Sequence, residues 1–248
     1  MIEYKSQREI ALMKEAGRIV ALCHEELKTF IKAGVSANEI DALVEKIILD
    51  NDATPSFKGF EGYPATTNVC INDVVVHGIP DDTRLKDGDI VTVDIGACYR
   101  GFHGDSGWTY AVGAVDEEKQ KLMEVTEGAL WEAIKIIGPG THLRDVSRTI
   151  QQYVESRGLS IVKELCGHGL GRGLHEDPMV LNYDAGVGDL VFKPGLVIAV
   201  EPIVASGSPK IAILDDEWTI VTVDGSPAAQ YEHTIAITKD GCEILTKL

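Results

Sequence analysis

The chain has 248 residues, 44% of them hydrophobic and 25% charged, and a formal net charge of −16 at pH 7. This length supports one large domain or two small ones, and the composition is that of a globular protein. The strong negative charge argues against nucleic acid as a direct partner, because the phosphate backbone would be repelled.

The N-terminal segment lacks the apolar stretch of a signal peptide, and no apolar run is long enough to cross a bilayer. The five cysteines are scattered and form no C-x-x-C pair, which is typical of reduced thiols rather than a disulfide framework. We therefore expect a cytoplasmic protein that has no membrane partner.

Helical spacing of apolar residues predicts four helices, at residues 6–32, 36–51, 116–137 and 142–157. Ser6 with Glu9, and Ser36 with Glu39, form S-x-x-E capping boxes at the first two starts. Seven runs rich in β-branched residues predict strands, at 68–76, 89–97, 102–112, 159–165, 196–204, 217–223 and 231–237. A short turn with Gly101 makes the second and third of these a hairpin.

A faint internal repeat divides the chain. Residues 34–53 align with 140–159 at an offset of 106, and apolar positions coincide at helical spacing. Residues 86–94 align with 193–201 at an offset of 107, and each segment runs from Lys-x-Gly through an apolar strand to a carboxylate. Two matched pairs at nearly one offset predict a duplicated α–β unit, with halves at roughly 1–115 and 116–248.

Carboxylates recur at the ends or heads of apolar strands. Asp94 and Glu201 end the matched strands, Asp105 lies across the predicted hairpin from Asp94, and Glu232 begins an apolar run. Taken singly, each is more often a turn cap or an ion-pair partner. Together, four such groups repel one another unless cations neutralise them, and two divalent ions with one imidazole ligand would do so.

The segment CGHGLGRGLHEDP, at 166–178, holds His168 and His175 between four glycines. It lacks the Gly-Lys-[Ser/Thr] of a phosphate-binding loop and has neither the G-x-G-x-x-G nor the H-E-x-x-H spacing. The glycines around His168 would let the backbone approach a metal centre closely, and His175 could then project into the same cleft as a catalytic imidazole. A surface loop with two solvated histidines is the alternative interpretation of this segment alone.

Eight segments in order make the sequence resemble the type I methionine aminopeptidases of bacteria. They are EAGRIVA, PSFKGFEGYP, VHGIPDD, DGDIVTVDIGA, GFHGDSGWTY, CGHGLGRGLHEDP, VIAVEPIV and AQYEHTIAIT. The resemblance implies an α+β pita-bread fold: two α–β halves related by a pseudo-twofold axis, a curved and mostly antiparallel sheet, and helices on its outer face. It also implies one catalytic domain over residues 1–248.

The resemblance further implies five ligands for two divalent ions, Co²⁺, Mn²⁺, Fe²⁺ or Zn²⁺. Asp105 and Glu232 match the ligands that bridge both metals, His168 and Glu201 match those of one ion, and Asp94 matches the chelator of the other. His77 and His175 match the two active-site histidines that are not ligands, and Glu201 also matches a proton shuttle. The walls of the methionine pocket match Phe57, Phe60, Tyr63, Leu174 and Trp218.

The implied reaction is removal of the N-terminal methionine from peptides and nascent proteins by a hydroxide that bridges the two metals. A monomer that contacts the ribosome is the associated expectation. The family often has tyrosine where this chain has Phe60, and phenylalanine where it has Leu174. The size of the methionine pocket could therefore differ from that of the family. An Xaa-Pro aminopeptidase or dipeptidase, a non-catalytic pita-bread scaffold and a nucleotide-binding protein are the alternative functions.

Overall fold

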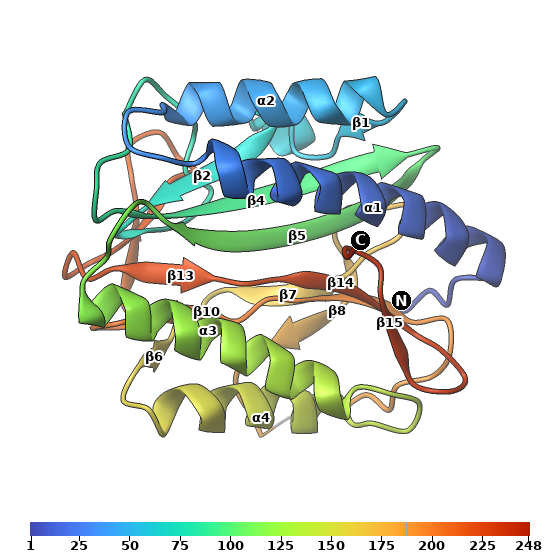
Figure 1. Cartoon of the computed structure of the whole chain (residues 1–248). Coiled ribbons are helices and arrows are strands. Elements are labelled where there is room, and N and C mark those ends of the chain that lie inside the picture. The colour runs from blue at the N-terminus through green and yellow to red at the C-terminus, as the bar shows by residue number, and fades with distance from the viewer. Residues whose placement is uncertain (187) are drawn as a thin grey trace.

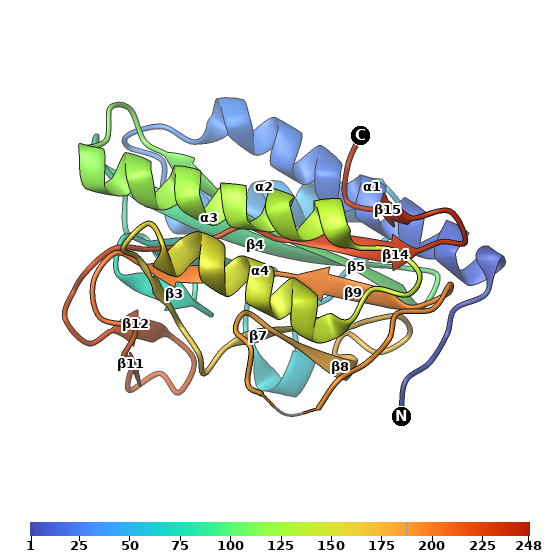
Figure 2. The same cartoon turned by 90° about the horizontal axis from the view of Figure 1, so that it is seen from below.

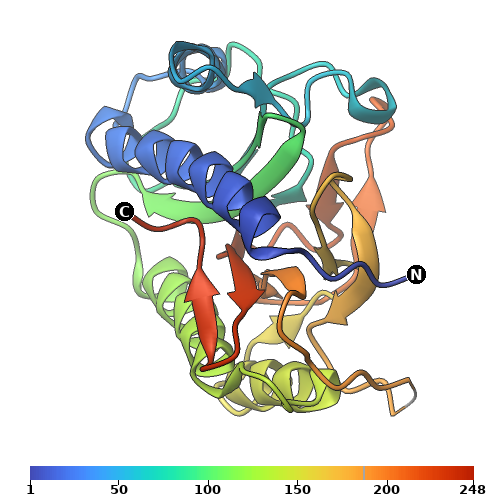
Figure 3. The same cartoon turned by 90° about the vertical axis from the view of Figure 1, so that its right-hand side faces the viewer.

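The computed structural model describes residues 1–186 and 188–248 of the chain. Strands form a curved central layer, and four long helices lie along its outer side (Figure 1). Seen from below, the helices lie on one side and strands β7, β8, β11 and β12 on the other (Figure 2). The view from the right shows the two N-terminal helices above the strands and the two later helices below them (Figure 3).

The four helices are α1 (Gln7–Phe30), α2 (Ala37–Asp50), α3 (Glu117–Ile136) and α4 (Leu143–Glu155). All four predicted helices are confirmed, with their ends within about two residues of the expected positions. The capping boxes of Ser6 with Glu9 and of Ser36 with Glu39 both form. None of the helices in the described ranges combines the length and apolarity that a membrane crossing requires.

The strands of the first half are β1 (Thr54–Pro55), β2 (Thr67–Ile71), β3 (Val74–Val76), β4 (Ile90–Tyr99) and β5 (Phe102–Ala111). Those of the second half are β6 (Ser160–Ile161), β7 (Cys166–Gly169), β8 (Glu176–Leu181), β9 (Val197–Val200), β10 (Ile203–Ala205), β11 (Ile211–Ile213), β12 (Ile220–Thr222), β13 (Ala228–Gln230), β14 (His233–Ile237) and β15 (Cys242–Ile244). Among the described residues they pair antiparallel, and β4 with β5 forms the predicted hairpin.

Four strand predictions were too long, and of the run 217–223 only the three residues of β12 are strand. The run 68–76 divides into β2 and β3 because Asn72 adopts a positive φ of 53° and turns the chain. The run 196–204 divides into β9 and β10 at Glu201, since the following Pro202 has no N–H to donate to a ladder. Of the run 159–165 only the two residues of β6 are strand.

Each half has its own apolar core. In the first half, α1 and α2 bury residues such as Ile19 and Ile40 against Val91 and Val93 of β4. In the second half, α3 and α4 bury Leu130 and Ile150 against a five-stranded sheet with the strand order β15-β14-β9-β7-β8. Helices α2 and α4 are the matched helices of the repeat, and β4 and β9 contain its matched strands, so the duplicated α–β unit is present in the fold.

The two halves meet along β5 and β14, and polar groups join them. The Glu232 N–H donates to the Gly107 carbonyl at 2.8 Å, and the Ser106 hydroxyl donates to the Glu232 carbonyl at 2.6 Å. The Thr234 hydroxyl donates to the Asp105 carbonyl at 2.7 Å. These bonds fix the strand that carries Asp105 against the segment that carries Glu232.

Candidate metal centre

The first two carboxylates lie on one face of the β4–β5 hairpin. Asp94 is opposite Gly107 and Asp105 is opposite Gly96, so the four residues form the corners of one patch on that face. Asp94 lies in the middle of β4 and does not end a strand, contrary to the prediction. A Cβ on Gly96 would meet Phe57 at 2.7 Å, so the bare glycine corner leaves room for an aromatic ring beside the acids.

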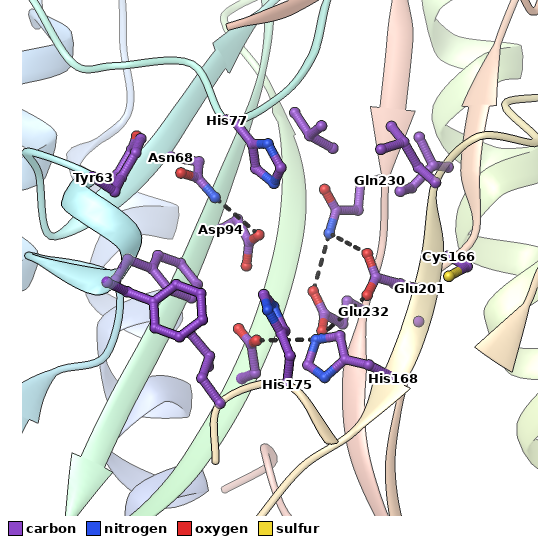
Figure 4. A pocket seen from close by; sticks show the side chains of 18 of the residues that line it. Tyr63, Asn68, His77, Asp94, Cys166, His168, His175, Glu201, Gln230 and Glu232 are labelled. Atoms are coloured by element: carbon purple, nitrogen blue, oxygen red, sulfur yellow. Dashed lines mark hydrogen bonds and ion pairs between the residues drawn. The ribbon is translucent and has the colours of Figure 1, made fainter. Parts of the chain in front are cut away.

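The second half supplies three more groups. Glu201 follows β9 directly, Glu232 precedes β14, and β9 and β14 are neighbours in the five-stranded sheet. His168 lies on β7, which pairs with the other edge of β9. Five side chains from distant parts of the sequence therefore converge on one point between the halves (Figure 4).

The convergence places negative charge where water is scarce. Asp105, Glu201 and Glu232 are 3%, 8% and 1% exposed, and no lysine or arginine is among the described residues that line the cavity. Asp94 Oδ1, Asp105 Oδ1 and Glu232 Oε1 are buried and have no hydrogen-bond partner within the described structure. Unpaired buried carboxylate oxygens are costly, and divalent cations would supply the missing partners.

His168 presents a free nitrogen to this cluster. Its Nδ1 lies 2.9 Å from the Gly169 carbonyl, which can only accept, so Nδ1 carries the proton and Nε2 holds a lone pair. Nε2 lies 3.7 Å from Asp105 Oδ2 and 3.8 Å from Glu201 Oε1, too far for hydrogen bonds. Metal bonds of about 2.1 Å at a tetrahedral angle would separate ligand atoms by about 3.4 Å, so the spacing fits a cation between them.

Burial raises the pKa of each of the four carboxyls in the cluster. Burial raises the pKa of Asp94 to about 6. Burial also raises the pKa values of Asp105, Glu201 and Glu232 well above their ordinary range, and the charges of neighbouring carboxylates add to it. Burial lowers the pKa of His168 to about 4, which keeps its imidazole neutral at pH 7. Ligand atoms of Asp105, His168 and Glu232 all lie within 4.8 Å of one another.

The cavity around these groups has a volume of about 370 Å³. All twelve predicted site residues line it: Phe57, Phe60, Tyr63, His77, Asp94, Asp105, His168, Leu174, His175, Glu201, Trp218 and Glu232. Its apolar end is a cluster of Phe57, Tyr63, Ala65 and Leu174, with Phe60 and Trp218 packed against it.

His77 and His175 flank the acidic cluster from opposite loops (Figure 4). The His175 ring meets that of Phe60 edge to face at 5.2 Å between centroids, and His77 lies 6.4 Å from the Trp218 ring. Burial lowers the pKa of both histidines, so they are neutral donors or acceptors at pH 7. The glycine-rich segment is thus not a surface loop of two solvated histidines, because both its imidazoles line the cavity.

Sequence reasoning missed several lining residues. Asn68 lies opposite Asp94 on β2 and donates to its Oδ2 at 3.2 Å, and Gln230 lies two residues before Glu232. A spacing of two along an extended strand puts two side chains on one face, which was the available signal for Gln230. Glu61, Glu164, Leu165, Cys166 and Met179 also line the cavity.

A buried set of four carboxylates and one imidazole, between two matched α–β halves, defines a metal-dependent hydrolase of the pita-bread class. The model of metallopeptidase family M24 matches residues 11–239, and the chain therefore belongs to that family. Its use of divalent metal follows from that membership, and the residues described above fit such ions.

The relatives within this family are methionine aminopeptidases. The chain is 49% identical to methionine aminopeptidase 1 of Bacillus subtilis over 100% of both chains, and 44% identical to methionine aminopeptidase of Clostridium perfringens over 99% of both. The crystal structure of methionine aminopeptidase from Thermotoga maritima matches with a TM-score of 0.98 and 46% identity, covering 100% of both chains. The prolidase of Pyrococcus furiosus matches at a TM-score of 0.81 and 25% identity, with 99% of this chain and 65% of that one covered.

Proposed function

We propose that the chain is a metal-dependent aminopeptidase that removes the N-terminal methionine from peptides and nascent proteins. The buried cluster of carboxylates and one imidazole, beside an apolar pocket, carries this proposal. The relatives that share full length and nearly half the sequence are methionine aminopeptidases, whereas the prolidase is only 25% identical, which favours the methionine reaction over the Xaa-Pro alternative. The intact cluster disfavours a non-catalytic scaffold.

The five ligands divide between two cation positions. The resemblance to the family assigns Asp105 and Glu232 to both positions, and each has an unpaired buried oxygen that would be available to a cation. His168 and Glu201 would complete one position, and Asp94 the other. Bound divalent ions supply Lewis acidity, which lowers the pKa of water to about 7 and polarises the scissile carbonyl.

The remaining chemistry belongs to the protein. Glu201 takes the proton of the attacking water on a carboxylate oxygen and returns it to the leaving amine. His77 and His175, neutral and on either side of the cluster, hydrogen-bond the substrate and the tetrahedral intermediate. Exclusion of water by the buried walls strengthens each of these interactions.

The apolar end of the cavity receives the methionine side chain. Phe57, Phe60, Tyr63, Leu174 and Trp218 supply aromatic and aliphatic surface, which suits a flexible, polarisable thioether. The Trp218 ring meets Tyr63 edge to face at 5.1 Å between centroids, so the two rings pack together in the pocket wall. Leu174 is 3% exposed and closes the pocket beside His175.

The metals are two ions of the Mn²⁺, Fe²⁺, Co²⁺ or Zn²⁺ group, because carboxylates with one imidazole suit this borderline-hard set. We also propose that the whole chain is one catalytic domain that acts as a cytoplasmic monomer and meets nascent chains at the ribosome. The net charge of −16 argues against direct binding to nucleic acid.

Methionine release from metal-stripped protein tests the function, with Co²⁺, Mn²⁺, Zn²⁺ or anaerobic Fe²⁺ added back. The substrates are Met-Ala-Ser, Leu-Ala-Ser and Ala-Pro-Ala. We expect release from the methionine peptide alone. Cleavage of Ala-Pro-Ala alone would establish the Xaa-Pro reaction instead, and binding of two ions without cleavage of any peptide would establish a scaffold.

A further inference from the structure

We infer that Gln230 is a positioning residue that holds the carboxylates of Glu201 and Glu232 in the orientation that receives metal. The inference rests on the proposed metal-dependent function and assigns a role to a residue that does not itself bind the ions.

The contacts of the Gln230 amide are specific. Its Nε2 donates to Glu232 Oε2 at 3.0 Å and lies 3.4 Å from Glu201 Oε2 (Figure 4). An amide nitrogen has two protons and accepts none, so it can serve one oxygen of each carboxylate. The other oxygen of Glu232, Oε1, remains without a partner among the described residues and is free for a cation.

Gln230 is itself held from both halves. It is 1% exposed and pairs with Ile203 across β13 and β10. The backbone N–H of Gln230 donates to the Thr109 hydroxyl at 3.2 Å, and that hydroxyl donates to the backbone carbonyl of Gln230 at 2.8 Å. Thr92, on the neighbouring strand β4, completes the chain with a bond of 2.8 Å to Thr109. The backbone that carries the side-chain amide is therefore fixed from both halves, and the side chain itself is buried.

Gly107 leaves the space in which the amide lies. A Cβ at this position would approach Gln230 Nε2 to 3.0 Å and Glu232 Oε2 to 3.3 Å. Gly107 is opposite Asp94 in the hairpin, so the missing side chain opens the acidic face of the first half to Gln230 of the second. A side chain in its place would press on the hydrogen bond between the amide and Glu232.

A neutral donor suits this position better than a charged one. A lysine or arginine would neutralise the carboxylates permanently and compete with the cations for them. The amide stabilises the ionised carboxylates and leaves their charge available. Groups that orient metal ligands in this way typically change metal affinity by roughly 10–100-fold when they are removed.

The test replaces Gln230 with methionine, which keeps the length of the side chain and removes both donors. Binding of Co²⁺ to the metal-free full chain is measured by titration calorimetry, and the absorption spectrum of the bound Co²⁺ reports its coordination. We expect Gln230→Met to bind Co²⁺ roughly 10–100-fold more weakly, with an altered spectrum. Gly107→Ala is the second variant and should shift affinity in the same direction.

Tyr231→Phe is the matched control. It removes one buried hydrogen bond, from the Tyr231 hydroxyl to the Thr109 carbonyl at 3.0 Å, from the adjacent residue of the same segment. We expect it to lower the thermal midpoint while leaving Co²⁺ affinity and spectrum unchanged. The inference would be overturned if Gln230→Met bound Co²⁺ within twofold of the parent protein and with the same spectrum. Where Gln230→Met does not fold, the same result for Gly107→Ala would overturn it. Methionine release by the parent protein is measured separately, so failure of the proposed function would not be confused with failure of this role.

Discussion

The rings of His168 and His175 meet edge to face, with centroids 4.3 Å apart and planes at 77°. The two imidazoles are thus neighbours, yet only His168 directs a nitrogen at the carboxylates, within 3.8 Å of Asp105 and Glu201. His175 instead contacts Phe60, at the apolar end of the cavity. This difference in position supports the proposed roles, His168 as a metal ligand and His175 as a histidine that serves the substrate.

Replacing each histidine by alanine should separate these roles. We expect His175→Ala to bind the same number of Co²⁺ ions as the parent and to lose roughly 10²-fold in kcat, the usual effect of removing one donor to a developing oxyanion. We expect His168→Ala to lose metal affinity as well as activity. Calorimetry and methionine release measured on both variants check this, and full turnover by His175→Ala would contradict the assignment.

Asp94→Asn tests the ligand that only one cation position uses. The amide keeps the shape of the carboxylate but removes its charge, so we expect the number of tightly bound Co²⁺ ions to fall from two to one. Methionine release at saturating substrate should fall with it. The control is Asp82→Asn at the protein surface, where Asn38 Nδ2 donates to the Asp82 carboxylate at 2.9 Å. An Asp94→Asn protein that still binds two ions would remove Asp94 from the ligand set.

The raised carboxyl pKa values make the metal-free protein sensitive to pH. A carboxyl whose folded pKa lies above its unfolded value stabilises the fold below the unfolded pKa, near 4, and this stabilisation is lost as pH rises through the folded value. For Asp94 the folded pKa is about 6, and burial shifts the other three carboxyls in the same direction. Cations replace the lost protons, so the gain in thermal midpoint on adding Mn²⁺ should be larger at pH 7.5 than at pH 5.

Proton release gives a second reading of the same effect. Calorimetric titration with Mn²⁺ at pH 6, in buffers of different ionisation enthalpy, should show protons leaving the protein as the metal binds. Identical heats in all buffers would mean that the carboxyls are already ionised in the metal-free protein.

Gly104→Ala should destabilise the packing of α1 on β5. A Cβ on Gly104 would lie 2.6 Å from the Gly17 backbone nitrogen, so α1 could not keep its close approach to β5. We expect a loss of about 1–3 kcal/mol in the free energy of unfolding, measured by urea denaturation. Gly138→Ala is the control, because the contact nearest to its Cβ is at 3.6 Å. Equal stability of the two variants would show that α1 shifts easily.

Local sequence patterns predicted the four helices, the β4–β5 hairpin and the residue types of the metal site. Capping boxes and helical apolar spacing are local features, so they place α1 to α4 without knowledge of the rest of the chain. The internal repeat likewise predicted two halves, because it is found by aligning segments of the sequence and needs no knowledge of tertiary contacts. The roles of individual site residues came from resemblance to a family, since no regular sequence spacing relates Asp94 to Glu232.

The packing of the two halves determines where the carboxylates and the imidazole meet. Strand ends depend on partners: β4 continues past Asp94 because β5 and β2 both pair with it. The roles of Gln230 and Gly107 depend on the seam between the halves, where residues over a hundred positions apart come within hydrogen-bond distance. Sequence periodicity indicates which face of a helix or strand is buried. Only packing determines which buried side chains of different elements come together, and therefore where a charge cluster forms.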